Sequence, residues 1–242
     1  MKTPKGNSLK FFPTYGFCCA IFTLFLSACG NSTGNDSVTN HNNAGTGTST
    51  LLVTVDINAN DDKAVIGGFN TDYTVTVRDG SGNPVSGAIV TIQNSSIGSN
   101  ALPERAVLKG VYSLSGSTYP AGDFRLDVVR GTDNIQGVIL GGPMAHSILA
   151  PLENDTIRAD SVFTVRWSVP IQAKSAEVET KDLKVIAMAD QGFYQISAVD
   201  NPNRDKQRLR IFRFNELNIA GGLPGSIMRI KVRQTVEPYV VR

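Results

Sequence analysis

From residue 51 onward, apolar and polar side chains alternate in short runs that turn residues separate. In residues 51–57 every second side chain is a large apolar one, and residues 73–77 and 124–128 repeat the pattern. Successive side chains of a β-strand point to opposite faces, so this alternation is typical of strands with one buried face. No long run has the 3.6-residue period of a helix. The sequence therefore predicts an all-β fold.

The turns between these runs have clear signals. Residues 79–84 read Asp-Gly-Ser-Gly-Asn-Pro, in which Gly and Asn accept a positive φ and Pro fixes it. Short antiparallel strands joined by such turns are typical of β-sandwiches. Gly141, Gly142 and Pro143 interrupt the pattern in the middle of the chain. We therefore predict two consecutive antiparallel β-sandwiches, over residues 51–142 and 146–242.

The start of the chain has a different composition. Three lysines precede an apolar run at residues 11–28, which ends in small side chains. A positive start followed by an apolar stretch is typical of an export signal. The alternative is an uncleaved transmembrane anchor, but the run is at the short limit of a bilayer span, about 17–25 residues. Pro13 and Gly16 also interrupt it, so we favour a cleaved leader.

Residues 26–29, Leu-Ser-Ala-Cys, resemble the lipobox of bacterial lipoproteins, in which a peptidase cleaves before the cysteine and acyl chains are attached to it. The resemblance implies that residues 1–28 are a signal peptide, that cleavage falls between Ala28 and Cys29, and that Cys29 carries palmitate-type chains. Two or more such chains hold a protein to a membrane almost permanently. The expected location is the cell envelope, and Gly30 after the cysteine favours the outer membrane if the cell is Gram-negative.

A polar segment follows the cysteine. Residues 29–50 hold Asn, Ser, Thr and Gly with almost no large apolar side chain. Such a segment buries too little surface to offset its ordering entropy. We predict a flexible linker that spans on the order of 25 Å, from ~5–6 Å times the square root of its length. His41 lies in it and is expected to be solvated.

Two further resemblances concern the folded part. Residues 79–90, which contain Asn-Pro-Val-Ser-Gly-Ala, and residues 122–128 resemble strands of carboxypeptidase-regulatory-like and bacterial Ig-like modules. Such modules usually act as spacers, adhesion units or sugar-binding accessories. Residues 167–170, Trp-Ser-Val-Pro, and residues 223–232 resemble strands of fibronectin type III domains, whose tryptophan fills the core. Met228 stands where that family has tyrosine, so the hydrogen bond of that tyrosine must be absent or replaced.

The charge of the chain is close to balanced. The formal net charge is +2, and removal of the three leader lysines leaves −1 (2 − 3). Residues 29–145 are acidic overall and residues 146–242 are basic overall. A near-neutral protein is not steered strongly toward nucleic acid or an anionic membrane. We therefore expect no nucleic-acid partner.

Basic residues are concentrated late in the chain. One hypothesis is an anion-binding face for lipopolysaccharide phosphates, acidic glycans or nucleic acid. Its candidate residues are Arg208, Arg210, Arg229, Lys231 and Arg233. We favour a solvated face, because exposed runs of charge seldom bind a ligand specifically. In that interpretation the strand with Glu177 and Glu179 pairs with the strand at residues 229–233, so that opposite charges meet across the strands. Phe212 and Phe214 are expected in the core.

The sequence contains one partial metal-binding pattern and few of the residues that catalysis uses. Oxygen-bearing side chains alternate over residues 56–62 as in a calcium loop, but Asp61 and Gly67 stand where that loop needs glycine and glutamate. We predict a surface turn and no metal there, with a looser calcium site left open. The mature chain keeps only His41 and His146, and no nucleophile or cofactor motif accompanies them. We expect no cofactor. A pair of carboxylates for glycoside hydrolysis is left open, because the distance between two side chains in the fold cannot be read from the sequence.

These features together predict a non-catalytic envelope lipoprotein that serves as a structural or interaction module. Its expected partners are the membrane, through the lipid on Cys29, and an envelope protein or a glycan. The alternative is a glycan-binding accessory lipoprotein. That function requires exposed aromatic side chains, for which Tyr119, Tyr194 and Tyr239 are the candidates.

Overall fold

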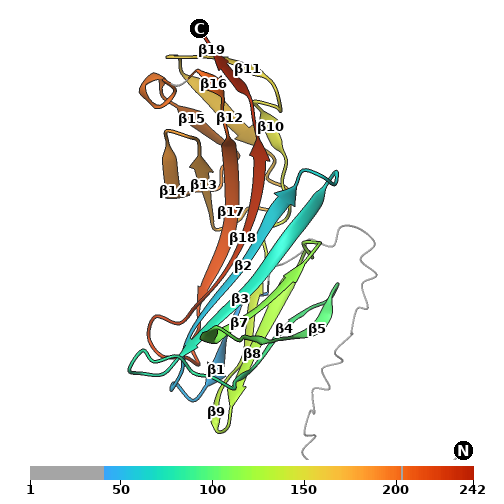
Figure 1. Ribbon diagram of the computed structural model, residues 1–242, viewed down its shortest axis with the longest axis vertical. Coiled ribbons are helices and arrows are strands. Elements are labelled where there is room, and N and C mark those ends of the chain that lie inside the picture. Colours follow the sequence, from blue (N-terminus) through green and yellow to red (C-terminus); the bar gives the residue numbers. More distant parts are fainter. Residues whose placement is uncertain (1–40, 203) are drawn as a thin grey trace, which may run out of the picture. The chain divides into compact units, whose positions relative to one another are not determined.

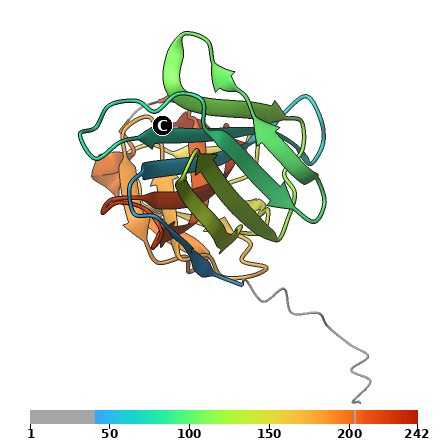
Figure 2. The same cartoon turned by 90° about the horizontal axis from the view of Figure 1, so that it is seen from below.

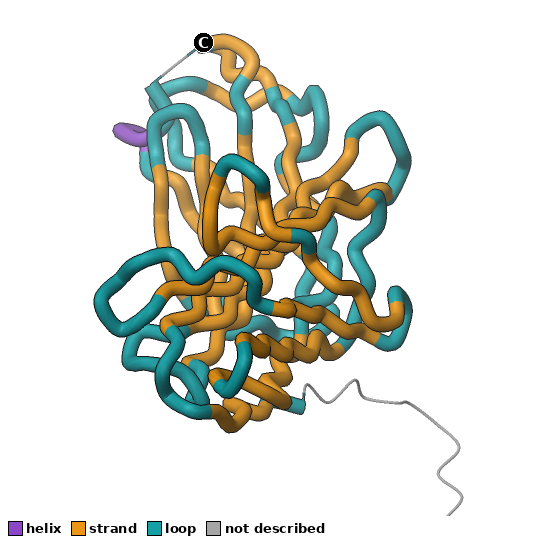
Figure 3. The backbone as a smooth tube through the Cα atoms, turned by 60° about the horizontal axis from the view of Figure 1, so that its bottom comes forward, coloured by secondary structure: helices purple, strands orange, loops and turns teal. Residues whose placement is uncertain are grey.

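The structure is a computed structural model that describes residues 41–202 and 204–242. Strands dominate these residues, and the one helix among them is a short 3₁₀ turn, η1 (Ala198–Asp200) (Figure 3). Leu51, Val53, Val55 and Ile57, which alternate with polar residues, are all buried. The predicted all-β sandwich architecture is confirmed.

A five-stranded antiparallel sheet forms one layer of the first sandwich. In spatial order its strands are β1 (Asn43–Gly47), β9 (Asp133–Gly141), β8 (Asp123–Arg130), β4 (Ile89–Asn94) and β5 (Gly98–Leu102). Alternate residues of β8, Phe124, Leu126 and Val128, are buried. They form part of the first core because the pleat directs every second side chain to one face.

An eight-stranded sheet forms the opposite layer and continues beyond the first sandwich. In spatial order its strands are β14 (Lys184–Met188), β13 (Ser175–Glu179), β17 (Leu209–Asn218), β18 (Ile227–Val236), β2 (Leu52–Asp62), β3 (Gly68–Arg78), β7 (Leu108–Gly116) and β6 (Glu104–Arg105). Strands β17, β18, β2 and β3 lie side by side (Figure 1). The contact between β18 and β2 is parallel, whereas the other neighbours are antiparallel.

The second sandwich is built from shorter strands. One three-stranded sheet has the order β10 (Ile148–Ala150), β12 (Phe163–Trp167) and β15 (Phe193–Ile196). Another has the order β11 (Thr156–Arg158), β19 (Tyr239–Val241) and β16 (Asp205–Lys206). Trp167 and Val165 of β12 pack against Val178 of β13 and Ile211 of β17 in the second core. The tryptophan therefore fills a core, as the sequence suggested.

The hairpin of β17 and β18 contributes to both cores. Leu209 and Ile211, at the start of β17, belong to the second core. Ile219, which follows β17, and Met228 and Ile230 of β18 belong to the first core. Residues 223–232 resemble a strand of the second sandwich, yet this strand begins in the first. The domain boundary predicted at residues 142–146 stays a prediction. The structure shows in addition that the hairpin of β17 and β18 contributes side chains to both cores.

Part of the predicted flexible linker is a strand. Residues 43–47 form β1, the blue strand of Figure 2, which pairs with β9. A Cβ on Gly47 would collide with the Asn134 carbonyl, and a Cβ on Gly221 would collide with the Thr46 backbone. Because glycine permits this close approach, a segment without large apolar side chains still packs. The prediction of flexibility is wrong for these residues, and residues 29–40 lie outside the described part.

The surface turn predicted at residues 56–62 is also wrong. Strand β2 continues through Asp62, and it remains paired with β3 over this whole stretch. The Asp61 carboxylate accepts hydrogen bonds from the backbone N–H and the hydroxyl of Thr235, both at 3.0 Å. The described residues include no group of three side chains placed to hold a metal ion.

Candidate functional site

Charged side chains cover the outer face of the eight-stranded sheet over β13, β17 and β18. Alternation along β17 buries Leu209 and Ile211 and leaves Arg210 partly exposed on the opposite side. We call this surface the charged face. Its members are Glu177, Glu179, Arg208, Arg210, Glu216, Arg229, Lys231 and Arg233. The structure thus brings all five predicted anion-binding cations to one face.

Four of these five cations already have a carboxylate partner. The ion pairs are Arg210–Glu179 at 2.8 Å, Arg229–Glu216 at 2.9 Å, Lys231–Glu177 at 2.9 Å and Arg233–Asp61 at 3.6 Å. The hydrogen bond from Arg229 lowers the pKa of Glu216 despite partial burial of that carboxyl. An external anion would have to compete with these built-in partners, so an anion-binding role for the four stays a prediction.

The predicted order of the strands on this face is wrong. Strand β13, which carries Glu177 and Glu179, pairs with β17, and β17 in turn pairs with β18. Glu179 therefore meets Arg210 on its direct neighbour, whereas Glu177 reaches across β17 to Lys231. The alternation of a strand shows which side chains share a face, but it does not show which strand lies next to it.

The two phenylalanines of β17 lie under the cations. Phe214 is buried and Phe212 is half-buried, but both alternate with the core residue Ile211 and so face the other way. The Lys231 ammonium lies 5.0 Å from the ring centre of Phe212 and 5.3 Å from that of Phe214. The expectation of a core position is confirmed for Phe214, which is 4% exposed, and is wrong for Phe212, which is only half-buried. They support the charged face through cation–π contact.

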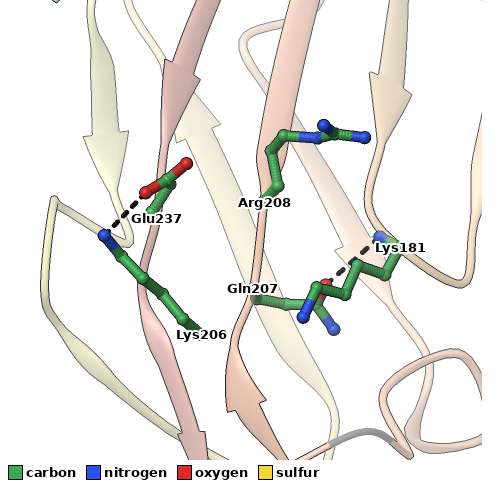
Figure 4. Close-up of a pocket in the computed structure, with 5 residues that line it drawn as sticks. All are labelled: Lys181, Lys206, Gln207, Arg208 and Glu237. Atoms are coloured by element: carbon green, nitrogen blue, oxygen red, sulfur yellow. Dashed lines mark hydrogen bonds and ion pairs between the residues drawn. The ribbon is translucent and has the colours of Figure 1, made fainter.

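Arg208 differs from the other four cations. It is exposed, no ion-pair partner for it exists among residues 41–202 and 204–242, and it lines a surface hollow of about 300 Å³. Figure 4 shows this hollow, in which Lys206 pairs with Glu237 at 2.6 Å and the backbone of Lys181 donates to Gln207. A second hollow, of about 520 Å³, also contains Lys181 and Arg208. Sequence reasoning missed Lys181 because it lies outside the arginine-rich stretch.

A buried ion pair lies on the other side of β17. The side chains of Arg213 and Asp190 have no exposed surface, and their closest atoms are 2.6 Å apart. Asp190 also accepts hydrogen bonds from the Trp167 indole at 2.9 Å and the Ala173 backbone at 2.8 Å. Arg213 donates to the carbonyls of Met144 and Ile171. The guanidinium therefore links β17 to the connection between the sandwiches.

These contacts decide the ionisation of the pair. Burial raises the pKa of Asp190, but hydrogen bonds from Arg213, Trp167 and Ala173 outweigh it and hold the pKa below its ordinary value. The carboxylate is therefore charged at neutral pH and compensates the buried guanidinium. The alternation along β17 could have revealed the buried arginine in the sequence, because Arg213 falls on the same face as the apolar residues Leu209 and Ile211.

His146 is buried next to this pair. Neither of its ring nitrogens has a hydrogen-bond partner among the described residues. Burial, followed by the charge of Arg213, lowers the pKa of His146 to about 3. The imidazole is thus neutral at physiological pH. It lacks the exposed, polarised geometry that a general base requires.

The remaining predicted residues are placed as follows. Ala28 and Cys29 lie outside the described residues. Tyr119 is half-buried against Phe69 and Phe124, and its hydroxyl donates to the Pro143 carbonyl at 2.7 Å. Tyr194 packs against the second core, whereas Tyr239 is exposed.

Within the described residues, no helix has the length and apolar character needed to cross a bilayer. Comparison with known proteins gave no matching family model and no matching curated protein.

Several solved structures resemble the chain weakly. The fibronectin(III)-like modules of Clostridium thermocellum CbhA align over 78% of this chain and 94% of that chain, with 13% identity and a TM-score of 0.30. The tandem Ig repeats of Dlar align over 80% and 99%, with 13% identity and a TM-score of 0.29. The Yersinia pseudotuberculosis adhesin InvE aligns over 78% and 60%, with 16% identity and a TM-score of 0.26.

Proposed function

We propose that this protein is a non-catalytic lipoprotein of the cell envelope, held to the membrane through Cys29, that acts as a structural or interaction module. The observation that carries the proposal is the hairpin of β17 and β18, which contributes side chains to both cores. A module that holds a surface at a distance from a membrane has to resist bending, and a shared hairpin opposes bending.

The packing gives a physical reason for this stiffness. Movement of the second core relative to the first would pull Met228 and Ile230 out of contact or Ile211 out of its own core. Exposing a large apolar side chain costs about 1.5–3 kcal/mol. The same movement would strain the buried contacts of Arg213 with Asp190 and Met144. The described β-structure is therefore suited to a spacer or scaffold role.

The titratable groups support a non-catalytic role. His146 is buried and neutral, Asp190 compensates Arg213, and Glu177 and Glu179 are paired with cations. General acid–base catalysis needs a group that reaches a substrate and exchanges a proton with it. These groups are instead engaged in holding the fold.

Lipidation is tested by metabolic labelling with a palmitate analogue and by mass spectrometry of the mature N-terminal peptide. We expect label on the wild-type chain and its loss in Cys29→Ala. Cys19→Ala is the matched control, because that cysteine lies within the predicted leader and its removal should leave the label in place. A mature protein that retains Met1, or label that persists in Cys29→Ala, would contradict the proposal.

A glycan-binding accessory role is the second candidate. It is supported by two exposed aromatic side chains, Tyr239 and Phe193, which are 42% and 47% exposed. Tyr119 does not contribute to it, since its ring packs against other aromatic rings. A glycan array probed with the wild-type chain and with Tyr239→Ala tests this role. No hits with the wild-type chain would remove it.

A further inference from the structure

We propose that Lys181, Lys184 and Arg208 form a binding site for a small tetrahedral oxyanion, a phosphate or sulfate group, at the end of the charged face. This inference goes beyond the proposed scaffold role and does not depend on lipidation. Of the five cations predicted from the sequence, the proposed site keeps only Arg208, and it adds Lys181 and Lys184, which the sequence did not suggest.

The three cations lie around one hollow at the ends of β13, β14 and β17. Glu179 of β13 faces Arg210 of β17, and the pairing of the two strands ends there. Lys181 lies in the turn that follows β13, and Arg208 directly precedes β17. The backbone N–H of Lys181 donates to the Gln207 side chain at 3.2 Å, which fixes the two segments next to each other (Figure 4). Lys184 faces Glu179 from β14. All three residues line the hollow of about 520 Å³.

The neighbouring carboxylates are already engaged. Glu179 pairs with Arg210 at 2.8 Å and Glu237 pairs with Lys206 at 2.6 Å. The side chain of Asp182 accepts a hydrogen bond from Gln207 at 3.3 Å.

By contrast, none of the three proposed cations has a carboxylate within ion-pair distance in the described part of the chain.

The chemistry of the donors selects the ligand class. A guanidinium presents parallel N–H groups that match two oxygens of a phosphate or sulfate, and each lysine adds a compact positive charge. Three cations suit a doubly charged oxyanion better than a singly charged halide. Because the side chains are exposed, we expect modest affinity that decreases as salt concentration rises.

Titration of the full-length protein in neutral detergent with inorganic phosphate tests the site. Ionic strength is held constant with sodium chloride, and binding is followed by calorimetry and by the melting temperature. We expect saturable binding, and a loss of affinity of about tenfold or more in Arg208→Gln, because a charge-assisted hydrogen-bond pair is removed. Lys181→Gln and Lys184→Gln should each weaken binding less, since each removes a point charge only.

Arg166→Gln is the matched control, since Arg166 is an exposed arginine of β12 outside the hollow. It should bind phosphate like the wild-type chain. All variants should melt at the wild-type temperature without phosphate, because the substituted side chains are exposed. Phosphate binding that survives both Arg208→Gln and Lys181→Gln, or a phosphate effect no larger than that of chloride, would overturn the proposal.

Two further arms distinguish the source of the anion. A sugar phosphate that competes with inorganic phosphate supports a site for a free or glycan-borne group. Vesicles of phosphatidylglycerol that bind the wild-type chain but release it on addition of phosphate support a lipid headgroup in the same site. Vesicle binding that phosphate and Arg208→Gln both leave unchanged would overturn the site.

Discussion

The two faces of β17 carry arginines in opposite environments. Arg213 points inward, has no exposed surface and is held by Asp190 and two backbone carbonyls. Arg210, three residues earlier, points outward and pairs with Glu179 where both side chains are 22% exposed. The comparison shows that the residue type alone says little about an ion pair, because the surroundings decide what its loss costs.

The physical difference lies in solvation. A charge that loses its partner on the surface regains water, so an exposed pair contributes about 0–1 kcal/mol. A charge that loses its partner in the interior regains nothing, and removal of one partner costs about 3–5 kcal/mol. The inner pair is therefore expected to hold the joint between the cores, whereas the outer pairs adjust the charge of the surface.

The largest expected effect comes from Asp190→Ala. This change leaves the Arg213 guanidinium buried without a counter-charge and should lower the free energy of unfolding by about 3–5 kcal/mol. Urea unfolding measures it, with Glu216→Ala on the outer face as the matched control at about 1 kcal/mol or less. If both variants lose the same stability, the contrast between the faces fails. If the alanine variant does not fold, the same measurement is made on Asp190→Asn, whose side chain has nearly the shape of aspartate but no charge.

A second test asks whether the shared hairpin belongs to the first core. Met228 is fully buried there, so Met228→Ala should cost about 2–5 kcal/mol through lost contacts and a cavity. Hydrogen exchange should rise first in β9, the strand of the opposite layer that lies against β18. Met188→Ala, at the margin of the second core, is the control and should cost less. Faster exchange confined to β12 in Met228→Ala would contradict the assignment.

The third prediction concerns pH. In the unfolded chain His146 takes up a proton near its ordinary pKa of 6.5, whereas in the folded chain its pKa is about 3. The unfolded state thus binds more protons in this window, and stability should fall as pH decreases from about 6.5 toward 3, by at most about 1.4 kcal/mol per pH unit. Because the pKa of Asp190 is also lowered, its contribution is lost only at the acidic end, as pH falls below its ordinary value.

His146→Leu isolates this effect. The variant keeps a neutral side chain of similar bulk and should flatten the dependence of stability on pH between about 6.5 and 4. Urea unfolding at several pH values provides the measurement. An unchanged slope would show that another group governs the pH response.

The smallest expected effect comes from Arg229→Gln on the charged face. The Arg229 side chain is 40% exposed and pairs with Glu216 above the Phe214 ring. Its loss should cost about 0–1 kcal/mol, and the cost should shrink in high salt because exposed charges are screened. Melting curves at low and high salt measure both. A loss of several kcal/mol would mean that the outer face also supports the joint.

Much of the strand pattern could be predicted from the sequence. The turn at residues 79–84 forms as expected, with Asp79 accepting the backbone N–H groups of Ser81 and Asn83 and with Gly82 at a positive φ. Strand β1 could not be predicted, because it packs through glycine backbone contacts that leave no hydrophobic signal. The site at Lys181, Lys184 and Arg208 could not be predicted either, since it depends on which carboxylates other cations have already engaged.

The sequence by itself determined most of the strands, though not β1 or the end of β2, and it determined which side chains of a strand share a face, because alternation is a local property of the backbone. It also supplied the lipobox resemblance at Cys29, which rests on sequence alone. Only the tertiary structure decided that β17 lies between β13 and β18, and that β18 pairs in parallel with β2 far back in the chain. Period-two patterns are the same whichever strand lies alongside, so the choice of neighbour depends on how whole sheets pack.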